Sequence, residues 1–351
     1  MKKCYVVFLL LLSASILLSA CGSNESSSKP AKSTSTVVGE NAPEPLGEHV
    51  SIKIGYPTQG ASMLSLWVAK DLGIFEKYGV DAELIYVAGT PKVQETLNSG
   101  GIQVGLAGAD SVGKAKVAGI DSVILSAVAD RSAMYVYGQK EIDQADITNE
   151  LKGKTIITGV EGSLYDHLAQ HYIKENGLVP KKDVKLLYMA GEGDRTAAFM
   201  KGDGDFYVAA SPTTFKMDEM GYPQLYDFKQ KEILNSGIVM KTEYYKENTQ
   251  LAEILVASLI EANANILADK EMAIESISKW TGLDDPELAE KTYEDLVDTL
   301  PVKPYVKESA AQFILDNSDN EKVRKLKTSD IVDDSLVKKL DESGFIDSLF
   351  K

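Results

Sequence analysis

Hydrophobic and polar positions alternate between two periods along most of the chain. Short runs with a period of two, typical of half-buried strands, are followed by loops of small residues and then by runs with helical spacing. Strands that alternate with helices predict parallel sheets in an α/β fold. The strand-like runs lie at residues 51–56, 82–87, 104–107, 155–158, 184–188 and 206–209.

These units form two groups along the chain. Residues 123–137 join the first group to the second, and residues 233–240 return the chain to the first. We therefore expect two α/β lobes with a central cleft, linked by two crossings that act as hinges. After Asn248 the pattern is helical almost to the end, beginning with the amphipathic run at 251–260. This helical C-terminal region is expected to cover the first lobe.

The segment LWVAKDLGIFEKYGVDAELI, which starts at Leu66, changes its period twice. Helical spacing stops at Gly73, resumes for about one turn, and stops again at Gly79 before a strand-like alternation. Glycine tolerates the left-handed conformation that ends a helix, so both glycines are predicted to be helix C-caps. Phe75 and Tyr78 are expected to fill the corner between the two helices as core residues.

The N-terminus has the pattern of an export signal. Lys2 and Lys3 precede an apolar run within residues 5–18 that is too short for a stable membrane span. The run ends in LSACG, which resembles the lipobox of bacterial lipoproteins, where cleavage leaves Cys21 as the acylated N-terminus. The expected segments are a signal peptide over 1–20, a flexible tether over 21–49, the first part of lobe 1 over 50–137, lobe 2 over 138–230, and a return to lobe 1 with the C-terminal helices over 231–351.

Composition narrows the class of protein. The chain has two cysteines, and Cys4 lies in the signal peptide, so the exported part cannot form a disulfide within itself. The net charge is −15, and loss of two lysines with the signal peptide makes it about −17. This sign argues against nucleic acid and against electrostatic docking on anionic lipid. We expect a monomer that its lipid holds on the outer face of a bacterial cytoplasmic membrane.

The candidate site is formed by the loops that follow the strands. In parallel sheets these loops gather at one edge, where helix N-termini present unpaired N–H groups to a ligand. The loops are rich in Gly, Ser, Thr and Asp, which favours a small polar ligand. The predicted ligand-binding residues are Tyr56, Thr58, Gln59, Ser62, Thr90, Asp110, Ser111, Arg131, Ser163, Glu192 and Ser211.

Two aromatic residues near the first loop have different expected roles. Trp67 is expected in the core, because tryptophan is usually largely buried. Tyr56 ends a strand beside the loop, and its amphipathic side chain is the better candidate to face a ligand.

The charges around the predicted cleft leave the sign of the ligand open. Helix N-termini, Arg131, Arg195 and hydroxyls such as that of Thr213 would hold an anion. Acids in the same loops would repel an anion unless they pair with Arg131 or Arg195, unless the ligand also carries an amino group, or unless these acids only cap helices. The acids are Asp110, Asp130, Glu161, Asp166, Glu192 and Asp194.

Five segments resemble the SsuA/THI5-like family of substrate-binding proteins. They are IGY at 54–56, LWVAKDLGIFEKYGVDAELIYVAG at 66–89, LKGKTI at 151–156, GLVPKKDVKLLYM at 177–189 and TAAFMKGDGDFYVAASP at 196–212. The resemblance implies a type II periplasmic-binding-protein fold and delivery of a solute to the permease and ATPase of an ABC importer. The family binds sulfonates, taurine, nitrate and pyrimidine precursors of thiamine, so it leaves the ligand open.

The sequence favours no enzyme, metal site or cofactor. His167 and His171 are four residues apart on a predicted helix, but the glutamate of the zinc-protease motif is missing between them. The sequence contains neither a Gly-x-Ser-x-Gly elbow nor a nucleotide-binding glycine motif. The resembled family includes a pyrimidine synthase, against which the export signal argues, and a sensor that presents its ligand to a receptor is a further alternative.

Overall fold

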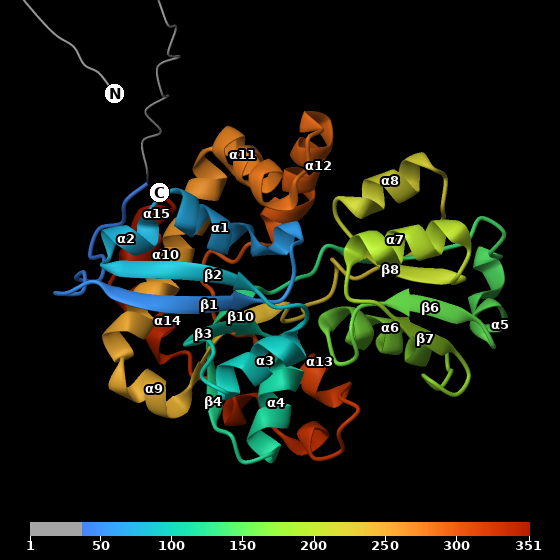
Figure 1. Cartoon of the computed structure of the whole chain (residues 1–351), viewed down its shortest axis with the longest axis horizontal. Helices are drawn as coiled ribbons and strands as arrows, with labels where there is room; N and C mark the ends of the chain where they lie inside the picture. Colours follow the sequence, from blue (N-terminus) through green and yellow to red (C-terminus); the bar gives the residue numbers. More distant parts are fainter. Residues whose placement is uncertain (1–36) are drawn as a thin grey trace, which may run out of the picture. The chain divides into compact units, whose positions relative to one another are not determined.

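The computed structural model describes residues 37–351, in which two five-stranded sheets each carry their own helices (Figure 1). The expected signal peptide and Cys21 lie outside the described residues. The two-lobed α/β architecture predicted from the alternating periods is confirmed.

The first sheet has the order β2-β1-β3-β10-β4. Strand β1 pairs in parallel with β2 and β3, so that Ile54 lies opposite both Leu84 and Val104. Strand β10 runs antiparallel to β3 and β4. The strands are β1 (Val50–Tyr56), β2 (Val80–Tyr86), β3 (Val104–Ala107), β4 (Ser122–Ala129) and β10 (Ser236–Lys241).

The second sheet repeats this plan with the order β7-β6-β8-β5-β9. Strand β6 is parallel to β7 and β8, whereas β5 is antiparallel to β8 and β9. The strands are β5 (Met134–Gly138), β6 (Thr155–Thr158), β7 (Lys185–Tyr188), β8 (Phe206–Ala210) and β9 (Gln224–Asp227).

The expectation of parallel sheets is therefore wrong for one strand in each lobe. The reversed strands, β5 and β10, are those that enter from the other lobe. The crossings span residues 130–133 and 228–235, and Ile233 N donates to Asp130 O at 3.0 Å between them. Because β5 belongs to the second sheet, the first lobe ends before Met134 and not at residue 137 as expected.

Helices flank both sheets. In the first lobe they are η1 (Ala61–Met63), α1 (Leu64–Asp71), α2 (Ile74–Lys77), α3 (Thr90–Asn98) and α4 (Ala109–Val117). In the second lobe they are η2 (Gln144–Asp146), α5 (Ile147–Leu151), α6 (Leu164–Glu175), α7 (Glu192–Lys201) and α8 (Thr213–Glu219). The C-terminal region contains α9 (Thr242–Glu247), α10 (Thr249–Ala268), α11 (Lys270–Thr281), α12 (Pro286–Leu296), η3 (Val297–Thr299), α13 (Glu308–Asp316), η4 (Val323–Lys325), η5 (Thr328–Asp330), α14 (Ser335–Glu342) and α15 (Phe345–Leu349).

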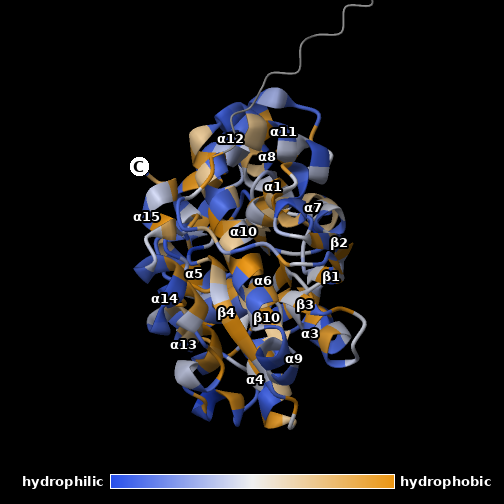
Figure 2. Cartoon of the chain, turned by 90° about the vertical axis from the view of Figure 1, so that its left-hand side faces the viewer, coloured by the Kyte–Doolittle hydropathy of each residue, from blue (hydrophilic) through white to orange (hydrophobic). Residues whose placement is uncertain are grey.

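The C-terminal helices pack on the first lobe, as predicted. Helix α10 lies against α1, and Trp280 of α11 stacks on Trp67 with ring centroids 5.8 Å apart. Trp67 is fully buried, which confirms its place in the core. Among the described residues, α10 is the one helix long and apolar enough to cross a membrane, but 89% of its most apolar window is buried inside the protein. In Figure 2, β4 is orange over most of its length while the outer side of α14 is mostly blue.

Residues 37–49 pack against the first lobe, so the expected tether does not extend to residue 49. Val37 N donates to Asn265 Oδ1 at 2.8 Å, and Leu46 N donates to Tyr78 O at 3.0 Å. Val37 and Leu46 are also partly buried against the core. Apolar side chains within a mostly polar stretch therefore dock it before β1 begins.

The two helix stops after Leu66 are confirmed. Gly73 and Gly79 follow the ends of α1 and α2 with φ angles of +65° and +82°. Phe75 and Tyr78, between them, are each 1% exposed. The double stop turns the chain from α1 into β2 around a filled corner.

Replacing Gly73 with alanine should lower the free energy of unfolding by about 1 kcal/mol, because an L-residue resists a positive φ. A Cβ at this position would meet nothing nearer than Glu76 Oε2 at 3.9 Å, so backbone strain is the whole effect. Urea denaturation of the purified protein measures it. The control is Gly193→Ala, inside α7 and open to solvent. This change should raise the free energy of unfolding slightly, because alanine is favoured over glycine within a helix. A stabilising effect of Gly73→Ala would contradict this account.

Candidate ligand-binding site

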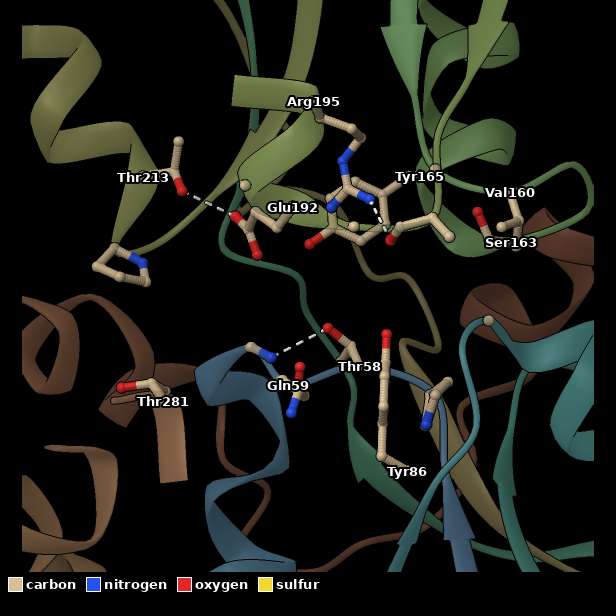
Figure 3. A pocket seen from close by; sticks show the side chains of 18 residues that line it. Thr58, Gln59, Tyr86, Val160, Ser163, Tyr165, Glu192, Arg195, Thr213 and Thr281 are labelled. Atoms are coloured by element: carbon tan, nitrogen blue, oxygen red, sulfur yellow. Dashed lines mark hydrogen bonds between the residues drawn. The ribbon is translucent and has the colours of Figure 1, made fainter. Parts of the chain in front are cut away.

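A cavity of about 370 Å³ lies between the two lobes (Figure 3). Its first wall consists of the loop after β1 (57–60) with Tyr86 and Gly89 after β2. Its second wall consists of loops after β6, β7 and β8, and Thr281 of the C-terminal region closes one side. The lobes touch beside it, since a Cβ built on Gly89 would lie 2.3 Å from Val160 Cγ2. A molecule in this cavity would contact both lobes.

Two helices of the second lobe begin at the cavity wall. Helix α6 follows Ser163, whose hydroxyl accepts a hydrogen bond from Asp166 N at 3.4 Å. Helix α7 follows Gly191. Both Ser163 and Gly191 line the cavity. Helix N-termini carry a partial positive charge and free N–H groups, so this wall favours a negatively charged group.

Arg195 contributes a fixed positive charge to the same wall. Its guanidinium lies over the Tyr165 ring, 4.4 Å from the ring centroid. The residue as a whole is 3% exposed. Nη1 donates to the carbonyl oxygens of Met189 at 3.1 Å and Ala190 at 3.0 Å. Its Nε has no hydrogen-bond partner among the described residues. The backbone therefore holds the guanidinium in place through Nη1, while Nε is left without a partner among the described residues.

Glu192 places a carboxylate in the wall opposite the first lobe (Figure 3). Thr213 Oγ1 donates to its Oε1 at 3.0 Å. A Cβ built on Gly60 of the first lobe would lie 4.0 Å from its Oε2, so this oxygen points across the cleft. Burial raises the pKa of Glu192 above its ordinary value, and the positive charge of Arg195 opposes the shift. Arg195 and the Thr213 hydroxyl thus stabilise the carboxylate less than burial destabilises it.

Tyr86 and Tyr165 supply aromatic surface from opposite lobes. Figure 3 shows Tyr86 rising from the first lobe toward the second. Tyr56, which was expected to face the ligand, is 6% exposed and lies outside the cavity lining, with its ring 5.8 Å from that of Tyr86. Both tyrosines end adjacent strands of one sheet, and only the tertiary structure shows which of them reaches the cavity.

Four of the predicted residues line the cavity: Thr58, Gln59, Ser163 and Glu192. The lining residues that sequence reasoning did not select include Tyr86, Val160, Tyr165, Arg195, Thr213 and Thr281, although Arg195 and Thr213 had been considered for charge and hydroxyl groups. Tyr165 and Val160 lie on either side of Ser163 in the sequence, so the prediction of Ser163 could have been extended to them. Thr281 ends a helix of the C-terminal region and carries no local signal.

Other predicted residues lie in two places away from this cavity. Thr90 and Ser111 are buried, and Ser111 Oγ donates to Thr90 Oγ1 at 3.2 Å between α3 and α4. Ser62, Arg131 and Ser211 line a separate cavity of about 20 Å³ on the far side of Tyr165. Arg131 donates to the carbonyl oxygen of Asp298, and Ser211 donates to Asp295. Their polar groups thus serve contacts within the protein.

Asp110, also predicted in the site, forms a buried contact between the lobes. It is 1% exposed, and its Oδ2 lies 2.9 Å from Lys114 Nζ and 3.3 Å from His167 Nε2 of the second lobe. Ser318 donates to its Oδ1. Burial raises the pKa of Asp110, but His167, Lys114 and Ser318 lower it more, and the result is about 2.

The remaining acids have local structural roles. Asp166 Oδ2 accepts from Gly162 N at 2.8 Å at the start of α6, and Asp130 lies 2.7 Å from Lys307 Nζ. Glu161 pairs with Lys181, and the Asp194 carboxylate lies against Gly191. Of the six acids considered, all within the described residues, Glu192 alone lines the cavity.

Replacing Asp110 with asparagine should lower the free energy of unfolding by about 2 kcal/mol at neutral pH. A depressed folded-state pKa contributes stability that is present above the unfolded value of 3.8 and is lost as pH falls through about 2. The difference between the two proteins should therefore shrink as pH falls from about 4 to about 2. Denaturation at a series of pH values measures this, with Asp319→Asn, an exposed partner of Lys114, as the control. A difference that is independent of pH would contradict the assignment.

Comparison with known proteins identifies relatives over most of the fold. The NMT1/THI5-like family model matches residues 61–273. A putative aliphatic sulfonates-binding protein of Escherichia coli is 26% identical over 283 residues, 80% of this chain and 84% of that protein. The putative binding protein YtlA of Bacillus subtilis is 19% identical over 216 residues, 60% of this chain, and the match spans 64% of YtlA. The alkanesulfonate-binding protein SsuA of Xanthomonas axonopodis, bound to MOPS, has the same fold, with a TM-score of 0.62, 22% identity, and coverage of 78% of this chain and 91% of SsuA. The chain belongs to the NMT1/THI5-like family and has the type II periplasmic-binding-protein fold.

Proposed function

We propose that the protein is the extracytoplasmic solute-binding component of an ABC importer. It captures a small polar nutrient by closure of its two lobes and delivers it to the permease and its ATPase. The observation that carries this proposal is the cavity whose walls come from both lobes, with the two chain crossings beside it. A ligand that contacts both walls favours the closed state over the open one. Relatives named as binding proteins support the same function.

The ligand is of the sulfonate, taurine or nitrate type. The N-termini of α6 and α7, Arg195 and the hydroxyls of Thr58 and Ser163 suit an anionic group. Relatives named for sulfonates agree with this chemistry. A simple anion offers no hydrogen-bond donor to Glu192, whose Oε2 faces the cavity across from Gly60. A zwitterion such as taurine offers an anion to the helix N-termini and an amine to Glu192.

An aminopyrimidine precursor of thiamine is the second candidate. The rings of Tyr86 and Tyr165 lie on opposite sides of the cavity and offer flat apolar surface to a heterocycle. Its amino group would donate to Glu192. Two other functions have less support: an enzyme similar to pyrimidine synthases, and a sensor that serves a receptor. The relatives YtlA and the sulfonates-binding protein of Escherichia coli are both named as binding proteins.

Calorimetric titration with taurine, ethanesulfonate, nitrate and an aminopyrimidine tests the ligand class, with Glu192→Gln as the variant. A charge-assisted hydrogen bond contributes about 1.5 to 3 kcal/mol, so loss of the Glu192 charge should weaken the amine-bearing ligand about 10-fold to 100-fold. Ethanesulfonate and nitrate should bind Glu192→Gln as well as they bind the unmodified protein, or more tightly.

The matched control for this titration is Asp194→Asn, an exposed acid outside the cavity lining. It should leave every affinity unchanged. Preference of the unmodified protein for ethanesulfonate over taurine and the aminopyrimidine, with no effect of Glu192→Gln, would exclude the amine. Failure of all four compounds to bind would contradict the proposed solute class.

Membrane attachment is proposed to occur through the acylated Cys21. The LSACG sequence around it supports this, and Cys21 is separated by only a short polar stretch from Val37, where the described fold begins. Expression of Cys21→Ser in a bacterial host should move the protein from the membrane fraction to the soluble or secreted fraction, without loss of solute binding. Cys4→Ser is the control and should stay in the membrane fraction. Membrane retention of Cys21→Ser would exclude the lipid anchor.

A further inference from the structure

One carboxylate of the C-terminal region binds two groups of the second lobe and one of the return crossing. Asp295, near the end of α12, accepts hydrogen bonds from the Tyr135 hydroxyl at 2.8 Å and from Ser211 Oγ. Its Oδ1 also lies 3.2 Å from Lys229 Nζ. The three partners come from β5, from the turn after β8, and from the start of the return crossing after β9. A single side chain therefore joins three separate segments.

This cluster is largely protected from solvent. The side chains of Asp295 and Lys229 are 12% and 15% exposed, and Ser211 is 3% exposed. Ion pairs at such sites are screened much less than surface pairs, and breaking one leaves a poorly solvated charge behind. Burial and the neighbouring Asp295 raise the pKa of Tyr135, so its hydroxyl remains a donor at neutral pH.

The next turn strengthens the connection to the crossings. In η3, the Asp298 carboxylate lies 3.4 Å from Lys229 Nζ, and its carbonyl oxygen accepts a hydrogen bond from Arg131. Arg131 belongs to the first crossing and Lys229 to the second. The end of α12 thus contacts both segments that link the lobes.

Helix α12 itself is held on the first-lobe side. Tyr293 donates to the carbonyl oxygen of Ile266, the antepenultimate residue of α10, at 3.2 Å, and α11 packs against α12. Glu290 and Glu294 both pair with Lys270 at the start of α11. Helices α10 and α11 in turn pack on α1. Asp295 is therefore held on the first-lobe side, whereas Tyr135 and Ser211 belong to the second lobe and Lys229 to the return crossing.

The residues that follow Ser211 in the sequence connect this cluster to the ligand cavity. Ser211 directly precedes Pro212 and Thr213, both of which line the cavity. Thr213 donates to Glu192. A shift of the turn that carries Ser211 would displace the hydroxyl that orients the Glu192 carboxylate.

We propose that Asp295 is the pivot on which the second lobe is oriented against the first, and that through Ser211 it positions the turn at 211–213 in the ligand cavity. It is a positioning residue and does not touch the ligand. Its effect on solute capture rests on the function proposed above, because only the fraction of molecules in the competent arrangement binds. The orientation of the lobes does not depend on that function.

The test compares ligand-free Asp295→Asn with the unmodified protein by small-angle X-ray scattering and hydrogen exchange. Loss of the charge should enlarge the radius of gyration, because the lobes are no longer held in one orientation. Amide exchange within residues 211–215 should become about tenfold faster or more. Both measurements are made where circular dichroism shows the variant to be folded, so a general loss of stability does not produce the result.

The matched control is Glu287→Gln on the same helix, whose carboxylate pairs with Lys291 of α12 itself and is 77% exposed. It should change neither measurement. If Asp295→Asn does not fold, Tyr135→Phe and Lys229→Gln each remove one of the contacts of Asp295 and should each enlarge the radius of gyration by a smaller amount. Unchanged scattering and unchanged exchange at 211–215 in the folded variants would overturn the proposal, even if a solute is found to bind.

Discussion

The structure depends on the two crossings between the lobes. Each sheet is completed by a strand that arrives from the other lobe, β5 in the second sheet and β10 in the first, so neither sheet is complete without the exchange. The second crossing is hydrogen-bonded to the first and to the end of β4, with Ile233 N on Asp130 O at 3.0 Å and Asn235 N on Ala129 O at 3.1 Å. Because the lobes meet at this pair of segments, the strand-end loops of both sheets face one shared cavity.

The chemistry of that cavity follows from which charges are already satisfied. Arg195 is held by the carbonyl oxygens of Met189 and Ala190, and Asp110 by Lys114, His167 and Ser318. Glu192 keeps one carboxylate oxygen directed toward the first lobe. The cavity therefore combines the positive ends of two helices and Arg195 with a single acid, and the proposal of a zwitterion or an aminopyrimidine as ligand depends on this combination.

The polar groups outside the cavity connect the lobes. His167 of α6 reaches Asp110 of α4, and Ser211 and Lys229 reach Asp295 of α12. These contacts flank the crossings and would all be altered by a change in the angle between the lobes. The proposed solute contacts and the proposed lobe-orienting contacts thus involve different residues, although the turn at 211–213 belongs to both.

The sequence alone determined the features that depend on local periodicity and local backbone chemistry. The alternation of strands and helices, the helix ends at Gly73 and Gly79, the buried Trp67, and the four lining residues Thr58, Gln59, Ser163 and Glu192 follow from such patterns. Only the tertiary structure decided which of several similar polar residues face the cavity. Asp110, Arg131 and Ser211 resemble ligand contacts in the sequence, but partners more than 80 residues away in the chain bind them: Ser318 for Asp110, Asp298 for Arg131 and Asp295 for Ser211. Tyr86 lines the cavity rather than Tyr56, and β5 and β10 run against their neighbours, because strand direction and side-chain access are set by how the chain crosses between the lobes.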